Sequence, residues 1–344
     1  MILRPVIAGD NTHPPFYPGP SRIGGIQIMN ILVTGGAGFI ASHLTDAYIA
    51  AGHDVAVLDD LSRGSMHNVN PGAHFYEGDV RDRDFVEYVF SREKPDAVNH
   101  HAAQIDVRRG VREPVFDASV NILGSITLLE AAVAHKVGRF VYISSAGATY
   151  GEPEKMPVPE EYPTKPVTPY GISKHSVEHY LDMFSALYAI PFVVLRYGNV
   201  YGPRQSSKGE AGVFAIFCEQ MLAGIRPSIY GDGTKVRDYV YVEDVVRANV
   251  LALERGRGET FNIASGVPTA DYEVFQRIRD ELGLVGLEPQ YAPKRPGEME
   301  RIYLDISKAQ ELLGWTPDFP LEEGVRRTVQ YYRQISDPAK QVLA

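Results

Sequence analysis

The chain has 344 residues, of which 44% are hydrophobic, so it can bury one large core or two unequal ones. Its net charge of −9 and pI of about 5.6 argue against a nucleic-acid partner. The single cysteine, Cys218, cannot form an internal disulfide, and no apolar run approaches the roughly eighteen residues of a membrane helix, so we expect a cytoplasmic protein without membrane association.

The first 28 residues differ from the rest of the chain. They contain five prolines and four glycines, and show neither hydrophobic periodicity nor the pattern of a signal peptide. Met29 stands immediately before the first regular element. We therefore predict a poorly ordered N-terminal tail over residues 1–28 that carries no function.

The next thirty residues have the pattern of a strand, a helix and a second strand. Residues 31–33 are apolar and β-branched in character, as in a buried parallel strand, and residues 55–58 repeat this pattern. Between them, Gly35 and Gly38 precede an amphipathic stretch over residues 39–51. This arrangement is the context that a dinucleotide-binding glycine motif requires.

The glycines and the acid that follows them point to NAD. A side chain at Gly35 or Gly38 would hold the backbone away from a pyrophosphate, whose charge the amino end of the helix attracts. Asp59 follows the second strand, where its carboxylate can accept hydrogen bonds from both adenosine ribose hydroxyls. The same carboxylate would repel a 2′-phosphate, so the sequence favours NAD over NADP.

Strands and helices then alternate along the chain, which predicts an α/β protein with a Rossmann-type, doubly wound parallel sheet. The predicted strands cover residues 74–80, 97–103, 140–145 and 192–196. The predicted helices cover residues 82–92 and 115–135, and a third begins near Tyr170.

From residue 197 onward the chain is richer in loops. We expect the NAD-binding domain to cover residues 29–196 and to include about 236–262, where a strand over 238–242 and a helix over 243–254 return to it. A smaller, partly interwoven substrate domain would then take about 197–235 and 263–340.

Tyr170 and Lys174 form the strongest chemical signal after the glycines. Four residues apart, they share one face of a helix. A free phenol has a pKa of about 10 and is a poor base at neutral pH, but a nearby ammonium stabilises the phenolate and lowers that pKa. We therefore expect Tyr170 to abstract a proton from a sugar hydroxyl.

The motifs together resemble the extended short-chain dehydrogenase/reductase family, and within it the UDP-glucose 4-epimerase type, over about residues 30–333. They include Thr34-Gly-Gly-Ala-Gly-Phe-Ile-Ala-Ser-His43, Gly78-Asp-Val80, His101-Ala-Ala103, Tyr150-Gly151, Tyr170-x-x-x-Lys174, Leu195-Arg-Tyr-Gly-Asn199, Tyr230-Gly-Asp-Gly-Thr234, Arg237-Asp238 and Arg295-Pro-Gly-Glu298.

The resemblance implies a role for each matching residue. Tyr170 would be the acid/base, and Lys174 would hold the nicotinamide ribose. The residues that would line NAD are Gly35, Gly38, Phe39, Ile40, Asp59, Asp79, Val80, Ala102 and Asn121, together with Tyr170 and Lys174. The residues that would hold the UDP part are Asn199, Val213, Tyr230, Arg237 and Arg295, with the two arginines on the diphosphate. A homodimer through helices 115–135 and 173–189 is also implied.

The sequence departs from the family pattern near the reacting sugar. The Ser/Thr expected there falls on Ala146, so we assign the substrate and catalytic hydroxyl to Ser145. Ile302 occupies the position of a variable pocket-wall residue and leaves open the choice between plain and N-acetylated sugars. A zinc-protease pattern, His-x-x-Glu-His, starts at His175, but it lies on the helix that presents Tyr170, so we expect no metal.

The type of reaction is predicted from the acidic and basic side chains that the sequence places near Tyr150. A dehydratase or decarboxylase would need a carboxylate between the serines and Tyr150, and residues 146–149 contain none. Return of the hydride to the opposite face of a 4-keto sugar then gives NAD-dependent 4-epimerisation of a UDP-sugar, most simply UDP-glucose and UDP-galactose. The alternatives are a UDP-N-acetylhexosamine or UDP-glucuronate 4-epimerase and a non-catalytic regulator that binds NAD or a nucleotide sugar.

Overall fold

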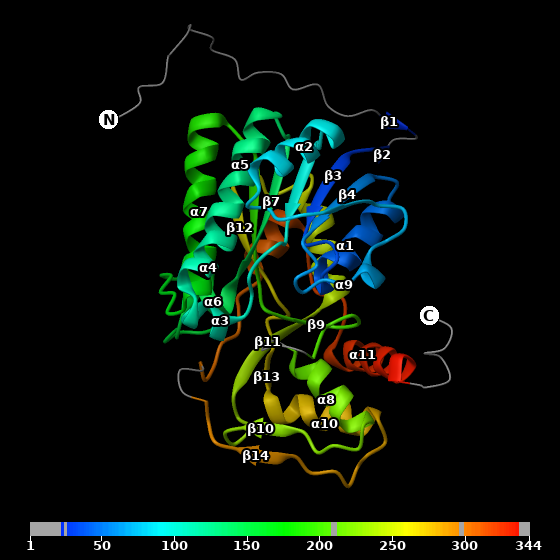
Figure 1. Ribbon diagram of the computed structural model, residues 1–344. Helices are drawn as coiled ribbons and strands as arrows, with labels where there is room; N and C mark the ends of the chain where they lie inside the picture. The colour runs from blue at the N-terminus through cyan, green and yellow to red at the C-terminus, as the bar shows by residue number, and fades with distance from the viewer. Residues whose placement is uncertain (1–21, 24–25, 208–211, 296–298, 337–344) are drawn as a thin grey trace, which may run out of the picture.

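A seven-stranded parallel sheet forms the larger part of the molecule (Figure 1). The computed structural model describes residues 22–23, 26–207, 212–295 and 299–336. The strand order is β12-β8-β7-β6-β3-β4-β5. These strands are β3 (Asn30–Thr34), β4 (Asp54–Asp59), β5 (His74–Glu77), β6 (Ala97–His100), β7 (Arg139–Ser145), β8 (Phe192–Tyr197) and β12 (Glu259–Ile263). The fold is therefore of Rossmann type, as predicted.

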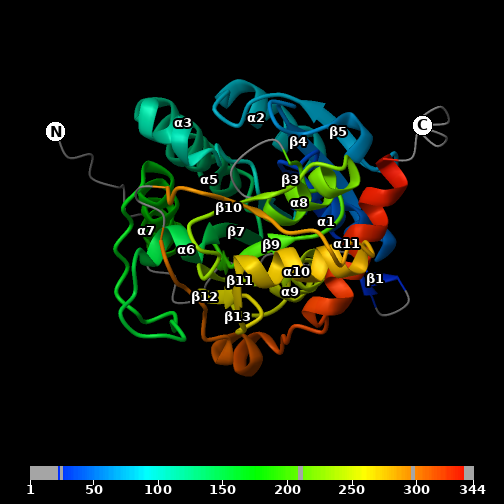
Figure 2. The ribbon, with the colours of Figure 1, turned by 90° about the horizontal axis from the view of Figure 1, so that it is seen from below.

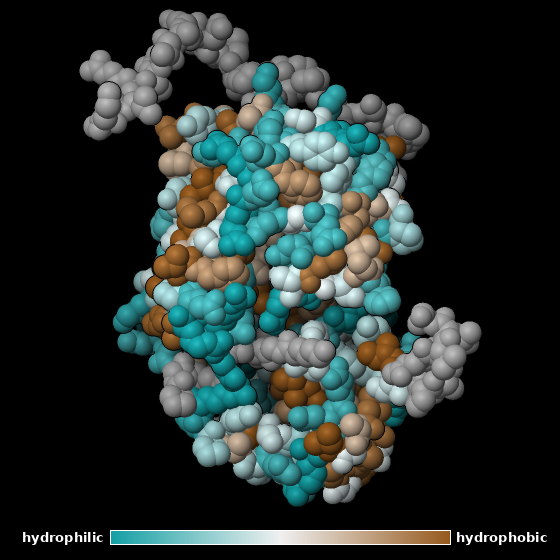
Figure 3. Space-filling view, in the orientation of Figure 1, coloured by the Kyte–Doolittle hydropathy of each residue, from teal (hydrophilic) through white to brown (hydrophobic). Residues whose placement is uncertain are grey.

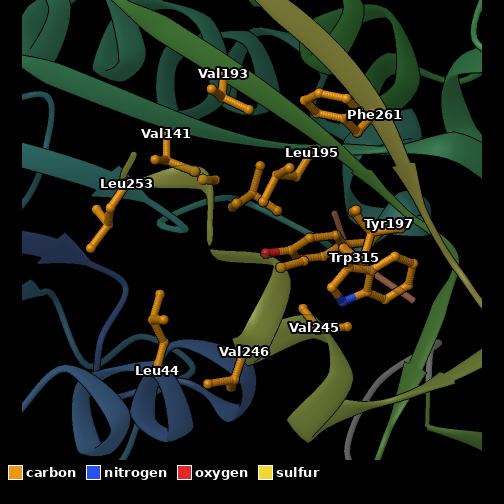
Figure 4. Close-up of a cluster of buried hydrophobic side chains, with 14 of the residues drawn as sticks. Leu44, Val141, Val193, Leu195, Tyr197, Val245, Val246, Leu253, Phe261 and Trp315 are labelled. Carbon is orange, nitrogen blue, oxygen red and sulfur yellow. The ribbon is translucent and has the colours of Figure 1, made fainter. Parts of the chain in front are cut away.

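Helices cover both faces of this sheet because alternate side chains of each strand point to opposite sides. Ile31 and Val33 of β3 pack with α1 (Phe39–Ala50) and α9 (Val242–Ala252), and Figure 4 shows Leu44 and Val246 of these helices in that cluster. Leu32 points to the other face, which is covered by α2 (Arg83–Glu93), α5 (Gly124–Ala134) and α7 (Pro169–Tyr188).

A smaller lobe lies below the carboxyl ends of the strands. Its three-stranded sheet has the order β13-β11-β9, and β10 pairs with β14. Figure 2 shows this lobe from below, where its helices α8, α10 and α11 pack against one another. The elements are β9 (Asn199–Tyr201), α8 (Val213–Leu222), β10 (Ser228–Tyr230), β11 (Val236–Tyr241), β13 (Pro268–Ala270), α10 (Asp271–Glu281), β14 (Gln290–Ala292) and α11 (Leu321–Ser336).

The remaining elements are short. They are β1 (Arg22–Ile23), β2 (Ile26–Gln27), η1 (Met66–Asn68), α3 (Val107–Arg112), α4 (Pro114–Ala118), η2 (Ser119–Leu123), α6 (Ala146–Tyr150) and η3 (Ala309–Leu313). β1 and β2 pair with each other inside the segment predicted to be a tail. Most of that segment, residues 1–21 and 24–25, lies outside the described residues.

The chain returns to the large sheet one element later than predicted. The strand expected over 238–242 is β11, but it pairs with β9 and β13 in the small sheet. The predicted helix 243–254 is α9, which packs against α1, and the strand that rejoins the large sheet is β12, paired with β8. We retain the division into an NAD-binding and a substrate domain as a proposal.

The helix predicted over residues 115–135 is a continuous run of α4, η2 and α5, interrupted only by the π-helical turn η2. Contrary to the sequence expectation, this stretch, Pro114–Ala134, is long and apolar enough to cross a membrane by length and composition alone. In the fold, α5 packs against α2 and α7. The apolar residues that satisfy this test thus include the side chains that cover the sheet.

Candidate active site

The turn between β3 and α1 contains glycines at which any side chain would have to displace neighbouring atoms. Gly35 has a φ of +72°, and a Cβ there would lie 2.8 Å from the backbone nitrogen of Ala102. Gly38 caps α1, and within the described part of the chain no side-chain hydrogen bond caps that helix. The backbone N–H groups at the amino end of α1 are therefore available to an anionic ligand.

Asp59 stands at the carboxyl end of β4, as predicted, and is held by two backbone groups. Its Oδ2 accepts a hydrogen bond from the N–H of Ala37 at 3.0 Å, and its Oδ1 accepts one from Leu61 at 2.8 Å. Burial raises the pKa of this carboxyl, and the two N–H donors act in the opposite direction. The carboxylate is thus fixed in orientation and has lone pairs left for further donors.

A cavity of about 520 Å³ opens along this edge of the sheet, which is a typical size for a ligand site. Eight of the residues predicted to contact NAD line it: Gly35, Gly38, Phe39, Ile40, Asp59, Asp79, Val80 and Ala102. Gln104 and Arg109 also line it, as do Arg63 and Arg204, which sequence reasoning did not identify. They lie in loops and short helices that carry no motif signal by themselves.

Asn121 lies behind the cavity wall and not on it. It is 2% exposed, and its side chain bonds both backbone groups of Gln104: Oδ1 accepts from the Gln104 N–H at 2.8 Å, and Nδ2 donates to the Gln104 carbonyl at 2.9 Å. Asn121 belongs to the π-helical turn η2, a feature that often marks functional sites. The structure thus assigns it a supporting contact to the wall.

Tyr170 and Lys174 lie in the first turns of α7, which Thr168 caps by accepting a hydrogen bond from Gly171. The Lys174 Nζ donates to the carbonyl oxygen of Ile143 in β7 at 2.8 Å and lies 5.9 Å from the centroid of the Tyr170 ring. Burial lowers the pKa of Lys174 to about 8.

The sequence prediction for the phenol of Tyr170 is wrong for the free chain. Its pKa is raised, first by burial and then by the negative charge of Asp117. The Lys174 ammonium donates its hydrogen bond to Ile143, and no hydrogen bond between it and the phenol is found among the described residues. A positive charge brought by a ligand would favour the phenolate.

Ser145 and Ala146 occupy the junction of β7 and α6. Ser145 is partly buried, and no hydrogen bond to its hydroxyl is found among the described residues. Ala146 is fully buried in an apolar cluster with Tyr150 and Ile302, which is 3% exposed. Ala146 offers no hydroxyl, so the assignment of that role to Ser145 stays a proposal, and Ile302 is buried in the same cluster as Ala146.

The residues predicted to hold UDP are spread over the small lobe. The Arg237 guanidinium donates to the carbonyl oxygens of Val236, at 2.8 Å, and of Met299, at 2.6 Å. Arg295 lies over the Tyr230 ring at 3.6 Å from its centroid. Asn199 begins β9 and Val213 begins α8, and within the described chain none of these five side chains lines the large cavity.

The His-x-x-Glu-His pattern is explained by an ion pair. Glu178 accepts two hydrogen bonds from Arg196, at 3.0 and 2.6 Å. Burial raises the pKa of Glu178, but the hydrogen bonds from His175 and Arg196 and the charge of Arg196 lower it to about 2. The Nδ1 of His175 donates to the same carboxylate at 3.1 Å, and its Nε2 shares a hydrogen bond with the Thr164 hydroxyl. No cluster suited to a metal ion occurs among residues 22–23, 26–207, 212–295 and 299–336.

Comparison with known proteins identifies the family of this chain. The model of the NAD dependent epimerase/dehydratase family matches residues 31–264. A UDP-glucose 4-epimerase of Mycolicibacterium smegmatis is 43% identical over 314 residues, which cover 90% of this chain and all of the relative.

Two crystal structures share the fold. The UDP-glucose 4-epimerase of Thermotoga maritima with UDP-glucose is 49% identical, with a TM-score of 0.88, and the match covers 89% of this chain and 99% of the other. The UDP-glucose 4-epimerase of Thermus thermophilus with NAD is 43% identical, with a TM-score of 0.83, and the match covers 88% and 98%.

Proposed function

The chain belongs to the NAD dependent epimerase/dehydratase family, and we propose that it is an isomerase that interconverts UDP-glucose and UDP-galactose with bound NAD. One observation supports this reaction over others of the family. Tyr170 and Lys174 stand at the carboxyl end of β7, and α6, which follows that strand, contains no carboxylate or thiol at residues 146–149. Without a second acid or base, hydride return is the simplest fate of a 4-keto sugar.

The cavity residues fit NAD. The absence of a Cβ at Gly35 lets the turn pack against the backbone of Ala102, the amino end of α1 faces the cavity for a pyrophosphate, and Asp59 accepts the ribose hydroxyls. When bound, NAD would supply hydride acceptance and return at C4 of the sugar. Gly35, Gly38 and Asp59 bind and orient this cofactor and take no part in proton transfer.

Tyr170 moves the proton. Its oxygen accepts the proton of the C4 hydroxyl and returns it in the second half of the turnover. The Lys174 ammonium, whose pKa is about 8, is mostly charged at pH 7 and favours the phenolate together with the positive charge of oxidised nicotinamide. Ser145 donates a hydrogen bond to the same sugar oxygen and so orients it.

Arg237 and Arg295 bind the diphosphate of the substrate, because guanidinium groups pair with phosphate oxygens in a fork and stay charged. Asn199, Val213 and Tyr230 hold the uridine. Ile302 shapes the sugar end from beneath Ala146. This division leaves the sugar free to present either face of C4 while the nucleotide remains held.

We propose a homodimer formed through the α4–α5 run and α7. These helices carry exposed apolar side chains, and Figure 3 shows brown side chains along the flank where they lie. The exposed residues are Val115, Leu123, Ile172, Met183 and Leu187. A dimer would cover this face, and this burial would account for the apolar character of the α4–α5 run. We expect a cytoplasmic enzyme that binds no nucleic acid.

A product screen tests the proposed activity. Purified protein is given UDP-glucose, UDP-N-acetylglucosamine and UDP-glucuronate in turn, and the nucleotide sugars are separated by chromatography. We expect UDP-glucose to be converted to UDP-galactose until a constant ratio is reached. Conversion of only one of the other two would instead identify the N-acetylhexosamine or uronate epimerase, and conversion of none would favour a binding protein.

A further inference from the structure

Asp117 is a fully buried carboxylate on α4 with two hydrogen-bond donors. Its Oδ1 accepts from the Ser173 hydroxyl at 2.7 Å, and its Oδ2 accepts from the Gln104 amide at 3.0 Å. Among the described residues, no lysine or arginine forms an ion pair with it. The Lys174 ammonium acts on it through space and not as an ion pair. A buried carboxylate held only by neutral hydrogen-bond donors is costly to a fold, so its presence indicates a specific role.

One of these donors, Gln104, belongs to the cavity wall. It lines the large cavity, and its backbone N–H and carbonyl are both bonded by Asn121, one turn after Asp117. The Gln104 side chain also bonds both backbone groups of Asp106. Asp117 and Asn121 therefore fix the side chain and the backbone of one wall residue from the same helical run.

The other donor, Ser173, belongs to α7. It immediately precedes Lys174 and follows Tyr170 by one helical turn, and it is 2% exposed. The backbone of α3 closes the remaining side, because a Cβ on Gly110 would lie 2.9 Å from the Asp117 Oδ2. Three segments, the cavity wall, α3 and α7, thus meet at one carboxylate.

We propose that Asp117 is a positioning residue for the epimerase: it joins Ser173 on α7 to Gln104 on the cavity wall and so fixes Tyr170 and Lys174 relative to the cofactor. This inference rests on the proposed function. The positions of the catalytic phenol and of the cofactor must agree within a fraction of an ångström for proton and hydride transfer to occur together.

The charge of Asp117 adds a second effect on the same pair. It raises the pKa of Tyr170 further than burial does alone, and it acts against the burial that lowers the pKa of Lys174. The other ionisable groups near the pair are Glu178 on α7, Tyr142 on β7, and His100 and His101 at the end of β6. Both histidines are kept neutral by burial, which lowers their pKa.

Two substitutions separate the contact from the charge. Ser173→Ala removes one hydrogen bond and leaves the carboxylate. Asp117→Asn removes the charge and can keep both contacts, because the amide donates to the Ser173 hydroxyl and accepts from Gln104. Asp182→Asn, an exposed carboxylate on the same helix, is the matched control.

For Ser173→Ala we expect kcat for UDP-glucose to fall about tenfold while KM stays within about twofold. For Asp117→Asn we expect the acidic limb of the kcat–pH profile to move about one unit lower, because Tyr170 loses its proton more readily. Asp182→Asn should change neither. If all three variants give the same kcat and the same profile as the parent, the proposal is overturned.

A binding measurement tests the positioning role of Asp117 independently of the epimerase activity. NAD is titrated into NAD-free protein by calorimetry, and we expect Ser173→Ala to weaken binding about fivefold, since the wall at Gln104 loosens. If the parent converts no UDP-sugar, the proposed function fails, but this titration still decides whether Asp117 and Ser173 position the wall. Equal affinities for Ser173→Ala and Asp182→Asn would contradict the proposal.

Discussion

At the cofactor end, one short glycine turn fixes the backbone around which other segments line the cavity, whereas at the proposed sugar end only side chains from separated segments meet. The glycine turn between β3 and α1 is shaped by positions where a Cβ does not fit. The sugar end draws on β9, α8, β10, β11 and the segment after β14. Backbone geometry leaves little freedom, while side chains can adjust, so we expect the two ends to respond differently to substitution. We propose that Tyr170 and Lys174 act where the two ends meet.

The largest expected effect is at the junction of the two ends. Tyr170→Phe removes only the hydroxyl, so turnover of UDP-glucose should fall about a thousandfold because no other group takes the C4 proton. NAD and UDP should bind as in the parent, as measured by calorimetry. Tyr162→Phe, a partly buried tyrosine in the loop before α7, is the control. Unchanged turnover in Tyr170→Phe would remove Tyr170 from the mechanism.

The next effect tests the cofactor end. Gly35→Ala should weaken NAD binding about a hundredfold, because the new Cβ would lie 2.8 Å from the Ala102 nitrogen and φ is +72°. Gly52→Ala is the matched control, since Gly52 has a φ of +89° but has no atom within 4 Å of the added Cβ. Both variants carry the backbone strain and only one carries the clash. Equal NAD affinities in the two would show that the close approach is not needed.

At the sugar end we expect a smaller and more selective loss. Arg237→Ala and Arg295→Ala should each raise the KM for UDP-glucose about tenfold and leave NAD affinity unchanged. Arg226→Ala, whose guanidinium bonds the carbonyl oxygens of Glu288 and Pro289 in the same lobe, should change neither constant. A parallel loss of NAD affinity in the first two variants would mean that the ends are not separable.

The smallest effect is on stability. Burial lowers the pKa of Lys174 from 10.5 to about 8, so between these pH values the unfolded chain binds more protons and stability rises with pH. Below pH 8 the buried ammonium destabilises the fold. Lys174→Met should therefore be more stable than the parent by about 1 kcal/mol at pH 7, although inactive. Urea unfolding should show this difference shrinking toward pH 10, and a constant difference would exclude this origin.

The contrast also explains what the sequence could predict. Gly35 and Asp59 act through local geometry in one strand–turn–helix–strand unit, so their pattern identified them, and the structure places both on the cavity. Arg204 lines the same cavity but was missed. It has a φ of +65° and pairs with Asp46 on α1, a contact between distant segments that no local pattern shows.

Two sequence expectations differ from the structure for the same reason, because both depend on contacts between distant segments of the chain. The pKa of Tyr170 depends on burial and on Asp117, which is 53 positions away in the chain but close in the fold, and helical spacing to Lys174 does not reveal either. Asn121, which the family resemblance implied for NAD, lies on the π-helical turn, and its amide bonds Gln104 behind the cavity wall. Motifs located the residues, whereas the partners of their polar atoms were decided by tertiary packing.

The hydride step is the most direct test of the account. UDP-glucose carrying deuterium at C4 is incubated with the protein in ordinary water, and the UDP-galactose formed is analysed by NMR and mass spectrometry. Because the hydride is held on the bound cofactor and Tyr170 exchanges only the hydroxyl proton, the account predicts that deuterium stays at C4 of the inverted sugar. Loss of deuterium to water, or a product not inverted at C4, would contradict it.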